Sequence, residues 1–383
     1  GIYIVFWGIM AFFWAQYSEA NGIRRRIYLI SFTLFICASV ISAISTNIWV
    51  LIAMRILQAC GASSAICVGA AVLSDIFGPN DRNFAFGVYF AGHCFGELVG
   101  PVIGGYVDEY FGWRWINWFL AIYVSFLLLL IILFVPETYR LPHPLSPEAH
   151  QPSSPTVRIP FNPLRPLRIL TYPTVFLISI YITTITSITY VQNITIPVSF
   201  TSIYKLPTHV IGYIYLLPGF GNVLGCITGG KFSDFISEKL REKGESENVE
   251  SIPEKRINSF WIGAIMIPAC YVTFGWALEN GIHISVPLIA LFVGGFSINV
   301  VFTSALAYLG DAHPPHAAAM VLVSDSMSFI VSGIMTVVTS LLKSYGYGWL
   351  FTILAIASVC GMILSVVVYF KGRSWREGRF ESS

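Results

Sequence analysis

Long apolar runs alternate with short polar segments along the chain, and this alternation defines the predicted elements. Eleven runs are long enough to cross a bilayer as helices, at about 20 residues each. Residues 141–166 hold eight of the twenty prolines and separate five runs from six. This composition cannot bury a core and is typical of a flexible linker. The runs lie near residues 2–18, 27–45, 48–74, 83–107, 115–135, 172–200, 211–233, 257–279, 284–309, 317–343 and 347–371.

The composition indicates an all-α integral membrane protein. The chain is 55% hydrophobic and 11% charged, with a mean hydropathy of +0.71, whereas an ordinary soluble domain has roughly 25% charged residues. We expect an amino-terminal bundle at 1–138, a cytoplasmic linker at 139–171, a carboxy-terminal bundle at 172–371 and a cytoplasmic tail at 372–383.

The lysines and arginines predict the orientation in the membrane. If alternate loops are taken as cytoplasmic, 18 of the 22 basic residues fall on that side. The opposite side holds only Arg114, Lys205 and Lys343, and Arg55 lies within a run. Because cytoplasmic loops are enriched in basic residues, the orientation is well defined.

Two stretches at cytoplasmic helix ends resemble each other. Residues 14–26 contain an acid, a glycine turn and three arginines, and residues 229–234 repeat a glycine, a basic residue and an acid. Transporter halves leave weak repeats of this kind. One run precedes the second copy after the linker, so we infer by symmetry that a first helix precedes Gly1 in the full protein, giving twelve.

A glycine motif lies inside the fourth run, at residues 92–105. Gly92, Gly96, Gly100 and Gly104 recur every four residues and form one bare ridge along a helix, where a neighbouring helix can approach closely. Pro101 removes the amide that would bond the carbonyl of Glu97, which adds a hinge. The ridge alone is equally compatible with simple close packing of helices.

Four stretches, in this order and spacing, resemble the major facilitator superfamily, most closely the fungal-type twelve-spanner drug:H+ antiporters. They are residues 55–61, 92–105, 112–115 and 136–139. The resemblance implies two pseudo-symmetric helical bundles. Ala15, Glu19 and Ile23 depart from the usual loop pattern of this family. The glycine motif is similar to the family's antiporter motif, which here comprises Gly92, Gly96, Gly100, Pro101, Gly104 and Gly105.

Ionisable side chains within the runs are candidates for proton coupling, because a charge at mid-bilayer costs about 2.5–3.5 kcal/mol and usually faces a cavity or a partner. Glu97 lies near the middle of its run, where desolvation should raise a carboxyl pKa toward neutrality. His93 is one turn away. The resemblance assigns proton coupling to Arg55, although a static ion pair is the alternative. Asp325 is either a second protonation site or a packing residue.

The resemblance also implies which helices line a substrate cavity and which charges control its opening. Each cavity candidate could instead be an interhelical contact, and each charge could merely set topology. The substrate-cavity candidates are Gln58, Tyr190, Gln192, Asn193 and Asn299. The gating candidates at cytoplasmic helix ends are Glu19, Arg24, Arg25, Asp75, Glu137 and Asp234.

These features predict a carrier rather than an enzyme, working by alternating access to export amphipathic organic compounds in exchange for protons. The sequence has no nucleotide-binding loop and no metal cluster, so we expect no cofactor and no nucleic-acid partner. We expect a monomer in the plasma membrane, or else the vacuolar membrane. The alternatives are a truncated non-transporting remnant, a membrane sensor with the same fold, and a narrow-specificity metabolite or polyamine exporter.

Overall fold

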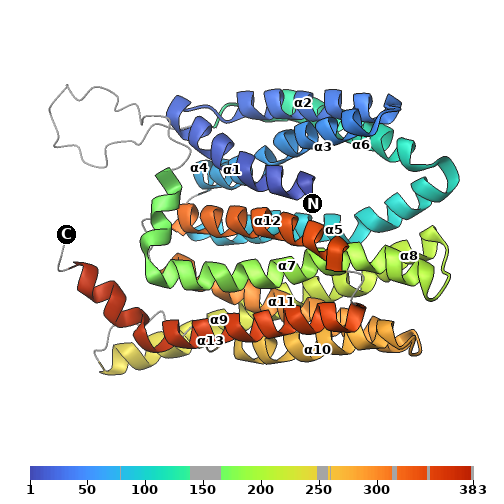
Figure 1. The fold of residues 1–383 in the computed structure, drawn as a ribbon. Coiled ribbons are helices and arrows are strands. Elements are labelled where there is room, and N and C mark those ends of the chain that lie inside the picture. Colours follow the sequence, from blue (N-terminus) through green and yellow to red (C-terminus); the bar gives the residue numbers. More distant parts are fainter. Residues whose placement is uncertain are drawn as a thin grey trace, which may run out of the picture. The chain divides into compact units, whose positions relative to one another are not determined.

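The structure, a computed structural model, describes residues 1–77, 79–138, 165–247, 258, 260–312, 317–342 and 346–380. Its regular elements within these ranges are helical (Figure 1). They are α1 (Ile2–Asn21), α2 (Arg25–Ile44), α3 (Ile48–Ala62), α4 (Ser64–Ile76), α5 (Pro79–Phe111), α6 (Trp113–Phe134), the 3₁₀-helix η1 (Arg165–Thr171), α7 (Pro173–Ser202), α8 (Thr208–Ile214), α9 (Leu216–Glu247), α10 (Trp261–Glu279), α11 (Ser285–Ala312), α12 (Ala317–Leu342) and α13 (Tyr347–Phe380).

Nine segments of the described chain are long and apolar enough to cross a membrane. They coincide with nine of the eleven expected runs. The other two runs are helical as α1 and α5 but are not among the nine, so the count of eleven stays a prediction. The structure also divides the third run into α3 and α4 at Ser63, which its uniformly apolar composition does not indicate.

Most of the expected linker lies outside the described residues, but its last seven residues form η1. Helix α13 continues to Phe380, beyond the expected end of the last run at 371. One lysine and three arginines follow the apolar part of this sequence. The helix therefore extends beyond the segment that is apolar enough to lie in the membrane.

The chain packs as two units. The amino-terminal unit comprises residues 2–90 and 113–166, and the carboxy-terminal unit comprises Gly1, residues 91–112 and residues 167–383. The boundary lies inside α5, whose second half packs with helices that follow the linker. Sequence order alone does not predict this assignment of residues 91–112.

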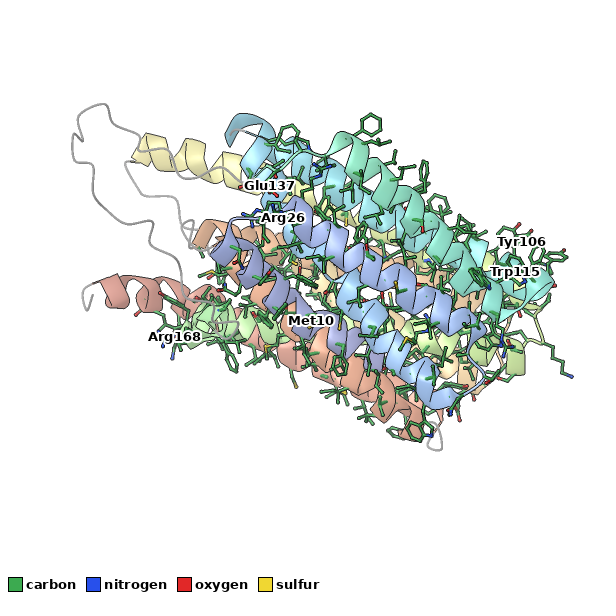
Figure 2. The ribbon with its side chains drawn as sticks, turned by 90° about the horizontal axis from the view of Figure 1, so that it is seen from above. Met10, Arg26, Tyr106, Trp115, Glu137 and Arg168 are labelled. Atoms are coloured by element: carbon green, nitrogen blue, oxygen red, sulfur yellow. The ribbon has the colours of Figure 1, made fainter. Side chains whose placement is uncertain are left out.

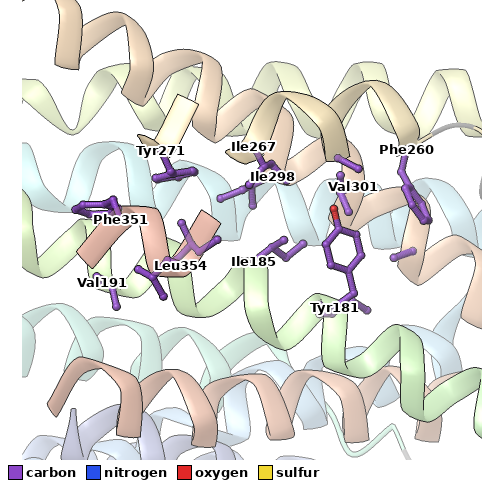
Figure 3. Packing of buried hydrophobic residues seen from close by; sticks show 14 of the residues in the cluster. Tyr181, Ile185, Val191, Phe260, Ile267, Tyr271, Ile298, Val301, Phe351 and Leu354 are labelled. Atoms are coloured by element: carbon purple, nitrogen blue, oxygen red, sulfur yellow. The ribbon is translucent and has the colours of Figure 1, made fainter. Parts of the chain in front are cut away.

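The core of the carboxy-terminal unit is formed by α7, α10, α11 and α13. Tyr181, Tyr271 and Phe351 are fully or almost fully buried in it, together with Ile185 and Val301 (Figure 3). The rings of Tyr271 and Phe351 are stacked with centroids 6.0 Å apart. Aromatic side chains contribute large contact areas, so these residues fix the helices of this unit against one another.

Glycines bring α9 and α11 into backbone contact. A Cβ built on Gly221 or Gly225 would collide with the carbonyl oxygen of Phe292 or Phe296. Small residues at such interfaces let helices approach closely and gain dispersion contacts. Gly221 and Gly225 are therefore required by packing.

We expect Gly225→Ala to destabilise this unit, because the new methyl group meets the α11 backbone. Overpacking costs about 1–3 kcal/mol, offset by up to about 1 kcal/mol of helix propensity. Gly230→Ala is the matched control on α9, since nothing among the described residues lies within 4 Å of its added Cβ. Thermal unfolding in detergent should show a lower midpoint for Gly225→Ala alone. Equal midpoints for the two variants would refute the close approach of α9 and α11.

Hydroxyl groups join α7 to α12, which lie side by side (Figure 1). Three pairs repeat at intervals of four residues along both helices, and all six side chains are buried. The hydroxyl–hydroxyl distances are 2.6 Å for Ser179 and Ser324, 3.1 Å for Thr183 and Ser328, and 3.1 Å for Ser187 and Ser332. We call these six residues the hydroxyl zipper. Polar contacts of this kind hold apolar helices together in lipid.

In the amino-terminal unit, hydrogen bonds surround the break between α3 and α4. The Trp14 indole donates to the Cys60 carbonyl at 2.7 Å, and the hydroxyls of Ser31 and Ser64 lie 2.6 Å apart. A Cβ on Gly61 would meet the backbone of α2. The break is therefore buried and satisfied by side chains of α1 and α2.

Candidate functional site

The glycine ridge does not pack against a helix of its own unit, so its role as a helix contact stays a prediction. Gly92, Gly96 and Gly100 are exposed, and nothing among the described residues lies within 4 Å of a Cβ built on them or on Gly104. Helix α5 nevertheless continues through Pro101. The bare ridge therefore leaves one side of α5 open.

The face of α5 that packs is the neighbouring one. A Cβ on Gly105 would lie 3.0 Å from the carbonyl oxygen of Thr208, and one on Gly212 would lie 2.8 Å from that of Pro101. Leu98 is buried and fills the space beside Gly219. The partner glycines on α8 and α9 select this face, and the glycine spacing within α5 does not reveal them.

Glu97 lies on the exposed side of α5, one turn after His93. The side chains of His93 and Glu97 are 48% and 46% exposed, and their Nε2 and Oε1 atoms are 3.8 Å apart. Glu97 is therefore not surrounded by protein as the sequence suggested. Its carboxyl group is thus only partly covered by the residues that the structure describes.

Asn222 of α9 connects Glu97 to α11. Its Nδ2 donates to Glu97 Oε2 at 3.4 Å. The other terminal atom of the Asn222 amide lies 3.2 and 3.1 Å from the carbonyl oxygens of Pro218 and Gly295. The Asn222 side chain therefore lies between Glu97 of α5 and the backbone of α11.

Asn299 lies beyond Asn222 on α11. It is half-buried, its Oδ1 accepts from Cys226 at 3.2 Å and its Nδ2 donates to the Gly295 carbonyl at 3.4 Å. Asn222 and Cys226 were not predicted as site residues. Their signal was available in the sequence, since they are one helical turn apart among the glycines of α9.

The polar residues of α3 have different surroundings. Gln58 is fully buried, and its Nε2 donates to Ser39 at 2.9 Å and to Asn117 Oδ1 at 3.4 Å. It therefore joins α2, α3 and α6 and is not open to substrate. Arg55 is half-buried near Tyr3 of α1. No ion pair of Arg55 occurs within the described residues, so the static ion pair considered above is not found there.

Three cavity candidates lie on α7. Gln192 is buried and accepts a hydrogen bond from the Tyr271 hydroxyl at 2.5 Å, so it acts as an interhelical contact. Tyr190 and Asn193 are half-buried. The ring of Tyr190 lies edge-to-face with Phe329 of α12 at 5.9 Å. Asp325, also on α12, is half-buried and follows the zipper residue Ser324.

Four of the six gating candidates meet at one end of the amino-terminal unit. The Arg24 guanidinium pairs with Asp75 at 3.0 Å and donates to Ser18 at 2.5 Å. Glu137 accepts from the backbone amides of Arg24 and Arg25 at 2.7 and 3.2 Å. Figure 2 shows Glu137 beside Arg26 at this end. Glu19 is exposed, and the side chain of Asp234 lies outside the described residues.

The carboxy-terminal end of α5 contacts α8 through a cluster of polar side chains that was not predicted. Glu109 binds His209, and Tyr106 binds Tyr213. The sequence signal was a tyrosine–acid–tyrosine segment at the end of the glycine motif. Its partner helix could not be identified without the fold.

These features define a polytopic helical membrane protein whose ionisable groups lie along and at the ends of its helices. The family model described as Major Facilitator Superfamily matches residues 1–335. The chain therefore belongs to the major facilitator superfamily. It is a multi-pass membrane transporter, a carrier rather than an enzyme.

Relatives over almost the whole chain are fungal transporters. The chain is 24% identical to the MFS antiporter QDR3 of Candida albicans over 98% of its length and 72% of that protein. It is 26% identical to citrate exporter 1 of Aspergillus niger, over 99% of its length and 79% of that protein. The crystal structure of the human organic anion transporter MFSD10 matches with a TM-score of 0.63 and 16% identity, covering 95% of this chain and 83% of that one, and so supports the fold alone.

Proposed function

We propose that this transporter exports amphipathic organic compounds in exchange for protons, with Glu97 as the proton-carrying residue. The observation that supports this most directly is the position of Glu97. It is exposed on α5 and within hydrogen-bond reach of Asn222 on α9. A carboxyl group that is accessible to protons and also linked to a neighbouring helix has the properties that coupling requires.

The coupling works through the Asn222 amide. When Glu97 is ionised, Asn222 donates to it across α5 and α9. A protonated carboxyl group is a weaker acceptor than a carboxylate, so protonation of Glu97 weakens this bond between α5 and α9. A proton thus biases which conformation is populated.

His93 and Arg55 complete the proposed proton-coupling set with Asp325. His93 is close enough to Glu97 for its ring to pair with the ionised carboxylate and to separate from it when the carboxyl group is protonated. Arg55 and Asp325 are half-buried ionisable side chains within helices, where unpaired charge is costly. Their participation would make the coupling a relay rather than a single site.

Tyr190, Asn193 and Asn299 are the proposed substrate contacts, because their side chains are half-buried. Few fixed charges and many aromatic side chains suit amphipathic organic molecules held by adaptable apolar contacts. Arg24, Arg25, Asp75 and Glu137 are proposed to stabilise the closed cytoplasmic end. We place the protein as a monomer in the plasma membrane.

The test is transport by the purified chain in proteoliposomes with an imposed pH gradient. A fluorescent amphipathic cation and radiolabelled citrate serve as alternative probes. Accumulation of the cation that vanishes when nigericin collapses the gradient supports the proposal. Accumulation of citrate alone would favour a narrow-specificity organic-acid exporter, and gradient-independent movement of either probe would refute proton exchange.

A further inference from the structure

Four side chains join the end of α5 to α8. The Glu109 carboxylate accepts from the backbone amide of His209 at 2.8 Å and lies 2.6 Å from its ring Nδ1. The hydroxyls of Tyr106 and Tyr213 are 2.6 Å apart. The Tyr106 ring also lies 5.9 Å from the His209 ring. We call Tyr106, Glu109, His209 and Tyr213 the outer cluster.

The outer cluster sits at the end of the unit expected to face outward. In Figure 2, Tyr106 lies at the opposite end of the helices from Arg168, which belongs to the basic, cytoplasmic side of the sequence. The side chains of Glu109 and His209 are 30% and 31% exposed. External protons can therefore reach the pair directly.

The titratable groups near Glu109 come from both helices. Helix α5 contributes Tyr106, Tyr110 and the preceding residue in sequence, Asp108, and α8 contributes His209 and Tyr213. The hydrogen bonds from the His209 backbone amide and ring hold the pKa of Glu109 below its ordinary value. Since an ionised carboxylate only accepts, His209 Nδ1 carries the proton in this contact.

The contact spans the two halves of the sequence. Helix α5 precedes the linker and α8 follows it. Below the outer cluster, the same two helices pack through Gly105, Pro101 and Gly212. In a carrier that works by alternating access, helices from the two halves separate on the side that opens. If α5 moves with the helices that precede the linker and α8 with those that follow it, the outer cluster breaks whenever the outward-facing state forms.

We propose that the outer cluster is an external latch, in which Glu109 and His209 hold α5 against α8 and protonation of Glu109 from outside releases them. The proposal rests on the chain being an alternating-access carrier. It does not depend on the identity of the exported compound or on Glu97 carrying protons.

The sign of the pH effect follows from the lowered pKa of Glu109. The latch is held above the ordinary pKa of the carboxyl group and is lost as external pH falls through the lowered value. His209→Gln removes the ring donor and leaves the backbone amide, so the release should move to higher pH. Glu109→Gln should release the latch at neutral pH and abolish this pH dependence.

The experiment measures access to a cysteine placed at Gly100, in a chain whose native cysteines are replaced by serine. Gly100 is exposed and has room for the added side chain. The probe is a membrane-impermeant maleimide added outside proteoliposomes at several pH values. We expect Glu109→Gln to raise the labelling rate several-fold at neutral pH, as loss of a charge-assisted hydrogen bond would allow.

Glu279→Gln is the matched control. Glu279 also accepts a backbone amide at a helix end, from Tyr347 at 2.6 Å, but it joins α10 to α13, both after the linker. This variant should label at the wild-type rate. Equal labelling of Glu109→Gln and wild type, or an acid response that His209→Gln does not shift, would overturn the latch. If the wild-type chain shows no proton-driven export but its labelling still responds to pH and to Glu109→Gln as expected, only the proposed function is contradicted.

Discussion

Glu97→Gln should abolish proton-driven accumulation while leaving downhill exchange of substrate intact. A tenfold proton gradient supplies about 1.4 kcal/mol per proton, enough to hold up to about a tenfold gradient of a neutral substrate exchanged one for one. An amide at position 97 cannot carry the proton, so the accumulation ratio should fall to about one. The measurement compares steady-state and exchange fluxes in the same proteoliposomes.

Asp108→Asn is the control for this prediction, because Asp108 is another acid on α5 and is half-buried. It should retain accumulation. A Glu97→Gln variant that still builds a gradient would show that another group carries the proton. Loss of exchange as well as accumulation would indicate that Glu97 is needed for substrate movement itself.

Asp75→Asn should cause a large loss of stability in the amino-terminal unit. The side chains of Arg24 and Asp75 are only 9% and 19% exposed, so an amide at position 75 removes a close negative charge from a largely buried guanidinium. Breaking such a pair typically costs about 3–5 kcal/mol. The unfolding midpoint in detergent should fall by roughly 5–10 °C.

The double variant Arg24→Met, Asp75→Leu distinguishes an uncompensated charge from lost packing. Replacing both members of a buried pair by apolar residues is often neutral, so the double variant should recover most of the lost stability. Arg26→Gln is the exposed control and should change the midpoint by less than about 1 °C. A double variant as unstable as Asp75→Asn would mean that packing, not charge, dominates.

The sequence predicted the class of fold well because bilayer-length apolar runs have few alternative structures. It could not predict which face of α5 packs. Glycines spaced by four residues on α5 allow either contact with another helix or an open groove. Which face of α5 packs depends on Gly212 and Gly219, more than 100 positions later in the chain. The exposure of Glu97 follows from the same choice of packing face.

The roles of buried amides were equally hidden from sequence. Gln58 and Gln192 were candidates for a cavity because polar groups in apolar helices require partners. Their partners in the structure are Asn117 and Tyr271, 59 and 79 residues away. A sequence shows that a partner is needed, but only the packing of the helices shows whether that partner is protein or ligand.

The hydroxyl zipper has a periodicity that leaves its own alignment ambiguous. Its pairs repeat every four residues with a constant offset of 145. Sliding α12 by four residues, about 6 Å, would pair Thr183 with Ser324 and Ser187 with Ser328, retaining two of the three contacts. The zipper thus binds α7 to α12 without choosing between neighbouring registers, and bulky contacts such as Tyr190 against Phe329 must make that choice.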